Sequence, residues 1–180
     1  MKAVLDACVL YPTVLREILI GAAVAGLYVP LWSERILEEW ARATAKLGPG
    51  EQAFARREIA ALKAAFPGAC VTRHQGLEAR LYLPDENDIH VLATAIAGGA
   101  DAIITLNASD FPRGVLAGEG LARRDPDGFL WELWSHHPGV IAAVAEAARA
   151  RAETALATPQ PMRALLKRAR LPRLGKALAP

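Results

Sequence analysis

Short apolar runs alternate along the chain with segments in which apolar residues recur at helical spacing. The runs at residues 3–5, 70–72 and 102–105 have the length and composition of strands, and residues 28–30 are brief and extended. The helical segments cover residues 15–22, 34–42, 52–65 and 84–97, and Ser33 is the expected N-cap of the second. Strands that alternate with helices indicate a mainly parallel sheet with both faces covered. The fold class is therefore α/β, and we predict a three-layer α/β/α sandwich.

The pattern changes after Asp110. Residues 114–126 are typical of a loop, residues 128–134 predict a short aromatic helix, and residues 139–157 predict a long Ala-rich helix. Two prolines close behind end that helix. We therefore expect a domain of residues 1–138 and a C-terminal helical extension of residues 139–180 that ends in a basic tail.

Composition adds limits on size and location. With 180 residues and 53% hydrophobic residues, the chain can bury the core of one ordinary domain. No apolar run has membrane-spanning length, and the start MKAVLDACVL is too short and too quickly acidic for a secretory signal. Two cysteines make neither a disulfide framework nor a zinc site. These features favour a cytoplasmic protein.

The formal net charge of +2 conceals a basic C-terminal tail. From residue 163 onward six cations occur without a carboxylate: Arg163, Lys167, Arg168, Arg170, Arg173 and Lys176. Such a run is either a solvated helix face or a contact for a phosphate backbone or an acidic partner. The sequence leaves both interpretations open.

Acidic residues stand where a parallel sheet places its ligand site, at the carboxyl ends of the strands. Asp6 follows the first apolar run, and Asp110 follows the run that ends at Thr105. Asp88 precedes Val91 by three residues, so helical spacing directs its carboxylate towards the apolar stripe. A carboxylate that faces a core is neutralised, paired or bound to metal.

The choice of Glu39 rests on its helix. Ile36, Leu37 and Trp40 define the inward stripe, with Glu39 at its margin and Glu38 closer to solvent. Carboxylates that converge in one pocket repel each other unless a cation is present, and oxygen ligands without a His or Cys cluster suit Mg²⁺ or Mn²⁺. Such an ion polarises a phosphoryl oxygen and activates water, so phosphodiester hydrolysis is the reaction class we expect.

Each acid also has a structural interpretation. Asp6 can end a strand, Asp85 and Asp88 can cap a helix, Glu39 can be a surface acid, and Asp110 can belong to a turn. For Asp85 we prefer the capping role. The case for a site depends on Asp6, Glu39, Asp88 and Asp110 together. His90 faces another side of the helix from Asp88, which suits a packing or solvent role better than metal binding.

Four segments carry a resemblance to a known family. They are Val4–Asp6, Ser33–Glu39, Asp88–Ala95 and Thr105–Phe111. In this order they resemble the motifs of a PIN domain, and most closely those of the VapC-like toxin ribonucleases of bacterial toxin–antitoxin pairs. The resemblance covers roughly residues 1–135. It implies an α/β/α sandwich, RNA cleavage that depends on Mg²⁺ or Mn²⁺, dimerisation and a cognate antitoxin.

The resemblance also implies roles for individual residues. The family's acidic positions match Asp6, Glu39, Asp88 and Asp110, which would be catalytic and bind metal. Three further residues would line the pocket: Thr105, Asn107 and Asp85. Asn107 stands where some members carry another Asp, which removes a charge from a second metal site, and Asp85 would lie outside the direct ligands.

Competing functions make different demands on the sequence. The first hypothesis is a metal-dependent endoribonuclease, and the alternative is a non-catalytic PIN-like module that binds RNA or protein. A haloacid-dehalogenase-like phosphatase would need an Asp two residues after Asp6, where Cys8 stands. A dinucleotide-binding domain would need a glycine-rich turn after the first strand, and residues 6–9 contain no glycine.

Overall fold

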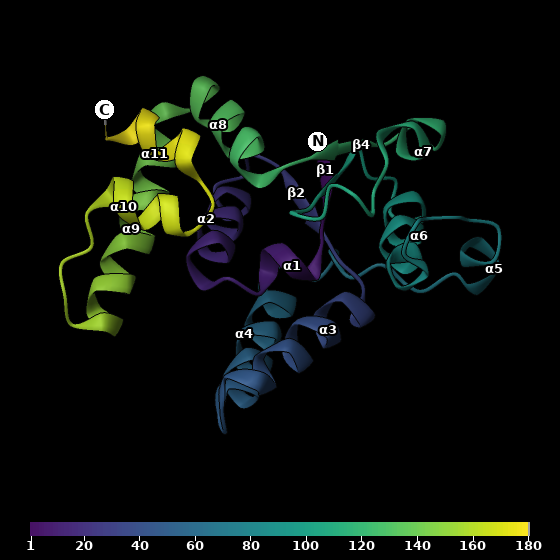
Figure 1. Ribbon diagram of the computed structural model, residues 1–180, viewed down its shortest axis with the longest axis horizontal. Coiled ribbons are helices and arrows are strands. Elements are labelled where there is room, and N and C mark those ends of the chain that lie inside the picture. The colour runs from purple at the N-terminus through teal and green to yellow at the C-terminus, as the bar shows by residue number, and fades with distance from the viewer. Residues whose placement is uncertain (180) are drawn as a thin grey trace. The chain divides into compact units, whose positions relative to one another are not determined.

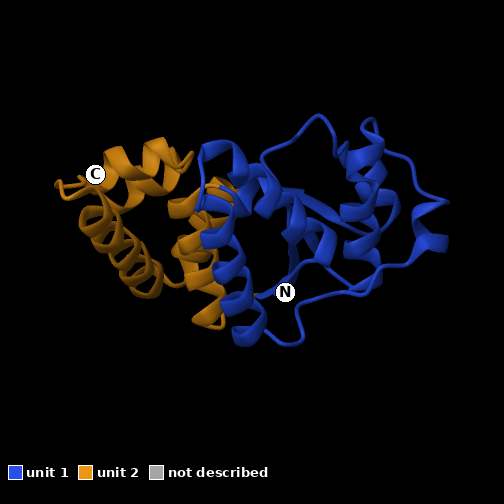
Figure 2. Cartoon of the chain, turned by 90° about the horizontal axis from the view of Figure 1, so that it is seen from below, with its two compact units in different colours: residues 1–11, 29–124 blue, residues 12–28, 125–180 orange. Residues whose placement is uncertain are grey.

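The computed structural model describes residues 1–179. The chain forms two compact units, coloured blue and orange in Figure 2. Unit 1 comprises residues 1–11 and 29–124, and unit 2 comprises residues 12–28 together with the chain from residue 125 onward. Every residue named above as a site candidate belongs to unit 1.

Unit 1 is built on a four-stranded parallel sheet. Its strands are β1 (Lys2–Leu5), β2 (Val29–Leu31), β3 (Ala102–Ile104) and β4 (Ala122–Arg124), in the order β2-β1-β3-β4. Val4 is aligned with Leu31 on one side and Ile103 on the other, and all three are buried. Since β1 and β3 are neighbours, the residues after them, Asp6 and Thr105, lie side by side at the carboxyl edge.

Helices surround this sheet, as Figure 1 shows. The described helices of unit 1 are α1 (Ala7–Leu10), α3 (Glu34–Thr44), α4 (Glu51–Ala65), α5 (Gln75–Glu78), α6 (Ile89–Ala97) and α7 (Arg113–Gly118), with the 3-10 turns η1 (Ala45–Leu47) and η2 (Glu86–Asp88). Helix α3 begins where expected, because Ser33 Oγ accepts a hydrogen bond from the Ile36 N–H at 3.3 Å. Its inward face buries Ile36, Leu37 and Trp40. Helix α6 packs on β1 and β3.

Unit 2 is helical. It contains α2 (Thr13–Val24), α8 (Pro126–His136), α9 (Pro138–Leu156), α10 (Met162–Arg168) and α11 (Pro172–Leu178). The aromatic ring of Tyr28 packs edge-on against Phe129 at 5.1 Å between centroids. In the basic tail, the guanidinium of Arg173 lies 3.8 Å from the ring centroid of Trp131. Among residues 1–179, no helix has both the length and the hydropathy that crossing a membrane requires.

The predicted fold class is confirmed: the chain is α/β, with a parallel sheet between helical layers and helices at the C-terminus. Several expected elements were wrong. Residues 70–72 form no strand, and only Cys70 makes an isolated bridge to Trp32. The expected loop at 114–126 contains most of α7, the whole of β4 and the first residue of α8. The helix expected from Pro84 begins at Ile89, after η2, so Asp88 precedes α6.

The domain boundary expected between residues 138 and 139 stays a prediction. The compact units divide the chain elsewhere, because α2 packs on α9 and joins the C-terminal helices. The contact is close: a Cβ on Gly21 would lie 2.5 Å from Val144 Cγ1. A side chain at this point of α2 would require Val144 to shift.

Candidate active site

Three carboxylates of unit 1 meet at one point. One ligand atom from each of Asp85, Asp88 and Asp110 lies within 4.8 Å of the others, and we call these residues the acidic cluster. Asp85 caps η2, because its Oδ1 accepts hydrogen bonds from the Asn87 N–H at 2.9 Å and from Asn87 Nδ2 at 3.0 Å. The tight turn that follows brings Asp88 back towards Asp85. Asp110 enters from the loop between β3 and α7.

The electrostatics of Asp88 reflect this crowding. Burial, followed by the negative charges of Asp6, Asp85 and Asp110, raises the pKa of Asp88 to about 6, and His90 opposes the rise. The Oδ2 atom of Asp88 is buried and has no hydrogen-bond partner. An oxygen in that position is costly unless something satisfies it. A hard divalent cation with oxygen ligands fits this donor set, since it would supply the missing partner and offset the repulsion.

Asp6 is fixed at the carboxyl end of β1, next to the cluster. It is 5% exposed, and its Oδ2 accepts hydrogen bonds from Thr105 Oγ1 at 2.7 Å and from Cys8 Sγ at 3.0 Å. Burial and the neighbouring Asp6 charge raise the pKa of the Cys8 thiol to about 12, so the thiol keeps its proton and acts as a donor. The Asn107 N–H donates to Thr105 Oγ1 at 2.9 Å. These bonds orient the Asp6 carboxylate, which contributes to the raised pKa of Asp88.

Glu39 has partners of its own. Its Oε1 lies 2.9 Å from His90 Nε2 and 3.1 Å from Arg35 Nε. Burial tends to raise the pKa of Glu39, but the contacts with His90 and Arg35 outweigh it and hold that pKa below its usual value. Glu39 is not among the three carboxylates that lie within 4.8 Å of one another. Its charge is balanced by Arg35, and the imidazole ring of His90 lies against the same oxygen.

A comparison with models of protein families shows which family the chain belongs to. The model of the PIN domain matches residues 2–109, which is more than half of the chain. The chain belongs to the PIN domain family. PIN domains are in general metal-dependent nucleases, and the acidic cluster of this one is the corresponding candidate metal site. Neither the curated proteins nor the solved structures gave a match.

The match covers most of the site of this PIN domain and stops at residue 109, directly before Asp110. Asp110 is half-buried, and its Oδ1 accepts from Ser109 Oγ at 3.2 Å. Arg123 of β4 holds the loop in place, because its Nη1 donates to the carbonyls of Ala108 at 2.5 Å and Phe111 at 3.1 Å. Arg123 is thus a positioning residue for Asp110. No sequence signal pointed to Arg123, because its strand was expected to be a loop.

The sequence-predicted residues therefore fall into three groups in the PIN domain. Asp88 and Asp110 meet in the acidic cluster, where they are joined by Asp85. Asp6 and Thr105 bond to each other beside it, and Asn107 contributes its backbone N–H. Glu39 pairs instead with Arg35 and with His90, which is buried at 3% exposure. A packing role was among those expected for His90, but its contact with Glu39 was not anticipated.

Proposed function

We propose that this PIN domain is a metal-dependent endoribonuclease that hydrolyses RNA phosphodiester bonds. The observation that carries the proposal is the state of Asp88. Its buried Oδ2 has no partner, its pKa is raised to about 6, and two further carboxylates lie within 4.8 Å. A site with this unrelieved charge is unfavourable for folding and is explained by a cation that it binds.

The acidic residues of the site have different roles in this proposal. Asp85, Asp88 and Asp110 would hold Mg²⁺ or Mn²⁺, and Asp6 adds negative charge from the position that Thr105 fixes. When bound, the ion polarises a phosphoryl oxygen and lowers the pKa of a water molecule. Because the pKa of Asp88 is raised to about 6, an ion that binds below about pH 6 would displace a proton from this carboxyl.

Glu39 is also proposed to belong to the site, in keeping with the family's motif. Its carboxylate is held by His90 and Arg35. To reach an ion at the acidic cluster it would have to give up at least one of these contacts. Without an ion, Glu39 contacts Arg35 and His90 and keeps both side chains beside the cluster.

RNA cleavage tests the proposal. A labelled RNA is incubated with the full chain and Mg²⁺ or Mn²⁺, with EDTA, and with the variant Asp88→Asn. We expect cleavage that EDTA abolishes and that Asp88→Asn lowers at least about 100-fold, because the variant removes charge where the ion binds. Glu51→Gln is the matched control, since Glu51 is an exposed acid on α4 of the same unit. Equal activity in wild type, EDTA and Asp88→Asn would contradict the proposal.

The finer proposal is that the protein is the VapC-like toxin of a toxin–antitoxin pair and acts as a homodimer. Its support is the resemblance of the ordered motifs. Expression of the wild type in a bacterial host should stop growth, and expression of Asp88→Asn should not. Light scattering at several protein concentrations tests the dimer. Normal growth with wild-type protein that cleaves RNA in vitro would reject the toxin role and leave the nuclease role intact.

The alternative is a PIN-like module that binds RNA or protein without cutting. Two observations favour it: Asn107 stands where some PIN domains carry another Asp, and Glu39 is engaged by Arg35 and His90. Calorimetric titration with Mn²⁺ separates the two functions. Metal binding accompanied by RNA turnover supports the nuclease, whereas RNA binding without turnover at saturating Mn²⁺ supports the module.

A further inference from the structure

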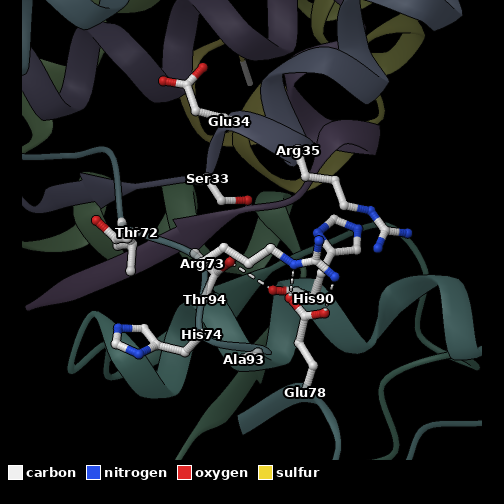
Figure 3. Close-up of a pocket in the computed structure, with 11 residues that line it drawn as sticks. Ser33, Glu34, Arg35, Thr72, Arg73, His74, Glu78, His90, Ala93 and Thr94 are labelled. Carbon is white, nitrogen blue, oxygen red and sulfur yellow. Dashed lines mark hydrogen bonds and ion pairs between the residues drawn. The ribbon is translucent and has the colours of Figure 1, made fainter. Parts of the chain in front are cut away.

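Unit 1 contains a cavity of about 210 Å³ that no step of the proposed hydrolysis uses. Its walls come from the start of α3, from residues 71–74 and from α6, and Figure 3 shows the side chains that line it. We propose that this cavity binds one nucleobase of a single-stranded RNA, next to the acidic cluster. The proposal deepens the nuclease function and rests on it for the identity of the ligand.

His90 is the first reason. The side chain is 3% exposed and lines the cavity, and its Nδ1 atom is buried without a hydrogen-bond partner. Nε2 lies 2.9 Å from Glu39 Oε1, so the unsatisfied atom of the ring is Nδ1. A buried imidazole left in this state is costly, because each nitrogen can donate or accept. A base bound in the cavity would lie against this ring and change the surroundings of the imidazole.

Two guanidinium groups at the cavity are the second reason. Arg73 makes two parallel hydrogen bonds to Glu78, at 2.9 and 2.7 Å, which fix the plane of its guanidinium. Arg35 is held by Glu39 at 3.1 Å and by the Asn87 carbonyl at 3.2 Å. Both side chains are about half-exposed, so they remain accessible. A planar, immobilised guanidinium is a surface on which a base stacks.

The place of the cavity is the third reason. Arg35 borders the cavity and also bonds to the carbonyl of Asn87, the residue directly before Asp88. Arg35, Arg73 and His90 border a second hollow that extends to Glu86 and Ile89. An RNA strand with its scissile phosphate at the acidic cluster would therefore have a neighbouring base within reach of the cavity.

The chemistry of the lining selects a base over an anion. Each arginine is already paired with a glutamate, so the cavity holds no uncompensated positive charge for a phosphate. Val71 and Ala93 contribute carbon to its lining, and the hydroxyl of Ser33, another lining residue, already accepts a hydrogen bond from the Ile36 N–H. The cavity of about 210 Å³ leaves room for one flat ring system. A neutral aromatic ring with polar edges matches this surface.

Binding of ribonucleosides to the full chain in EDTA tests the proposal without requiring metal or catalysis. The four ribonucleosides are titrated into protein labelled at its histidine rings, and the His90 signal is assigned with His90→Gln. We expect a saturable shift of the His90 signal by at least one ribonucleoside. Thr72 lines the cavity and is exposed, so Thr72→Trp should block the mouth without disturbing the core and weaken binding at least about 10-fold. Thr154→Trp, on an exposed position of α9, is the matched control and should bind as the wild type does.

Three results would overturn the proposal. The first is no saturable shift with any ribonucleoside. The second is equal binding by wild type and Thr72→Trp. The third is an equal shift with inorganic phosphate alone, which would make the cavity an anion site. Because these binding measurements are made without metal, they can be interpreted even if the protein does not cleave RNA. If the wild type cleaves a random-sequence RNA with a preference for one base, and Thr72→Trp loses that preference, both proposals are supported.

Discussion

Glu39 Oε1 lies 2.9 Å from Nε2 of His90, an imidazole that is almost fully buried on α6. This contact joins α3 to α6, and Arg35 completes it from the preceding turn of α3. It holds the pKa of Glu39 below its usual value even though burial works in the opposite direction. The pair therefore contributes to folding as well as to the surroundings of the acidic cluster.

Glu39→Gln should lower the stability of the protein at neutral pH. A lowered folded-state pKa means that the ionised Glu39 stabilises the fold above the ordinary value of 4.5, and that this contribution is lost as the pH falls through the folded value. Because the Glu39 side chain is 37% exposed, we expect a loss of only about 0.5–1 kcal/mol. Urea unfolding at neutral pH and at about pH 3.5 checks this. A variant as stable as the wild type at neutral pH would show that the contact contributes nothing.

Asp88→Asn should have the opposite effect in the absence of metal. The folded-state pKa of Asp88 is about 6, above its ordinary value of 3.8, so the fold is stabilised by the protonated form and loses that stability as the pH rises through about 6. Removing the charge should add about 1–2 kcal/mol at pH 7.5 after allowance for partial exposure, and almost nothing at about pH 4.

Thermal unfolding in EDTA measures the effect of Asp88→Asn. Glu86→Gln is the control, because Glu86 is an exposed acid of the same turn, outside the acidic cluster. Added Mn²⁺ should raise the unfolding temperature of the wild type and of Glu86→Gln but not that of Asp88→Asn. If Asp88→Asn is less stable than the wild type in EDTA at pH 7.5, the ionised Asp88 carboxylate stabilises the fold, and repulsion within the cluster is too weak to matter.

Metal affinity should depend on pH through the same carboxylate. Below about pH 6 an entering ion must displace a proton from Asp88, so the apparent affinity for Mn²⁺ should fall by roughly tenfold for each pH unit below that point. Above about pH 7 the affinity should level off. Calorimetry at several pH values, in buffers with different ionisation enthalpies, measures both the affinity and the released proton. An affinity that is flat between about pH 5 and 8 would place the ion away from Asp88.

Gly21 should be intolerant of a side chain. A Cβ there would lie 2.5 Å from Val144 Cγ1, so Gly21→Ala should destabilise the protein by about 1–3 kcal/mol. Val144→Ala removes the opposing methyl group. The double variant should therefore lose less unfolding free energy than the two single variants lose together. If the losses of unfolding free energy in the two single variants add up to the loss in the double variant, then Gly21 and Val144 do not restrict each other at this contact.

The sequence was sufficient for the elements whose residues carry strong local signals. Ser33 predicted the start of α3 because a capping side chain acts on a neighbouring N–H, and helical spacing predicted the buried residues Ile36 and Trp40. The run before Asp6 predicted β1 because a strand at the centre of a parallel sheet is apolar throughout. These signals act over a few residues or over one buried element.

Elements that depend on distant partners were missed. Strand β4 lies at the edge of the sheet and contains two arginines, so it lacks an apolar run that would predict it. Cys70 bridges Trp32, but no ladder extends from this single pair. For the site, the sequence identified the acidic residues, and their roles stay predictions. It gave Asp85 a capping role, which Asp85 has at the start of η2, but it did not predict the 3-10 turn that brings Asp88 back to Asp85.

The position of a bound ion decides whether the acidic cluster is a metal site. Crystals grown with Mn²⁺ give anomalous scattering that locates the metal independently of any assumption about its ligands. We expect a peak between the carboxylates of Asp85, Asp88 and Asp110, with at least two of them at about 2.0–2.3 Å from the ion. Fully occupied Mn²⁺ elsewhere in unit 1, with the acidic cluster holding none, would contradict a metal-dependent mechanism at these residues.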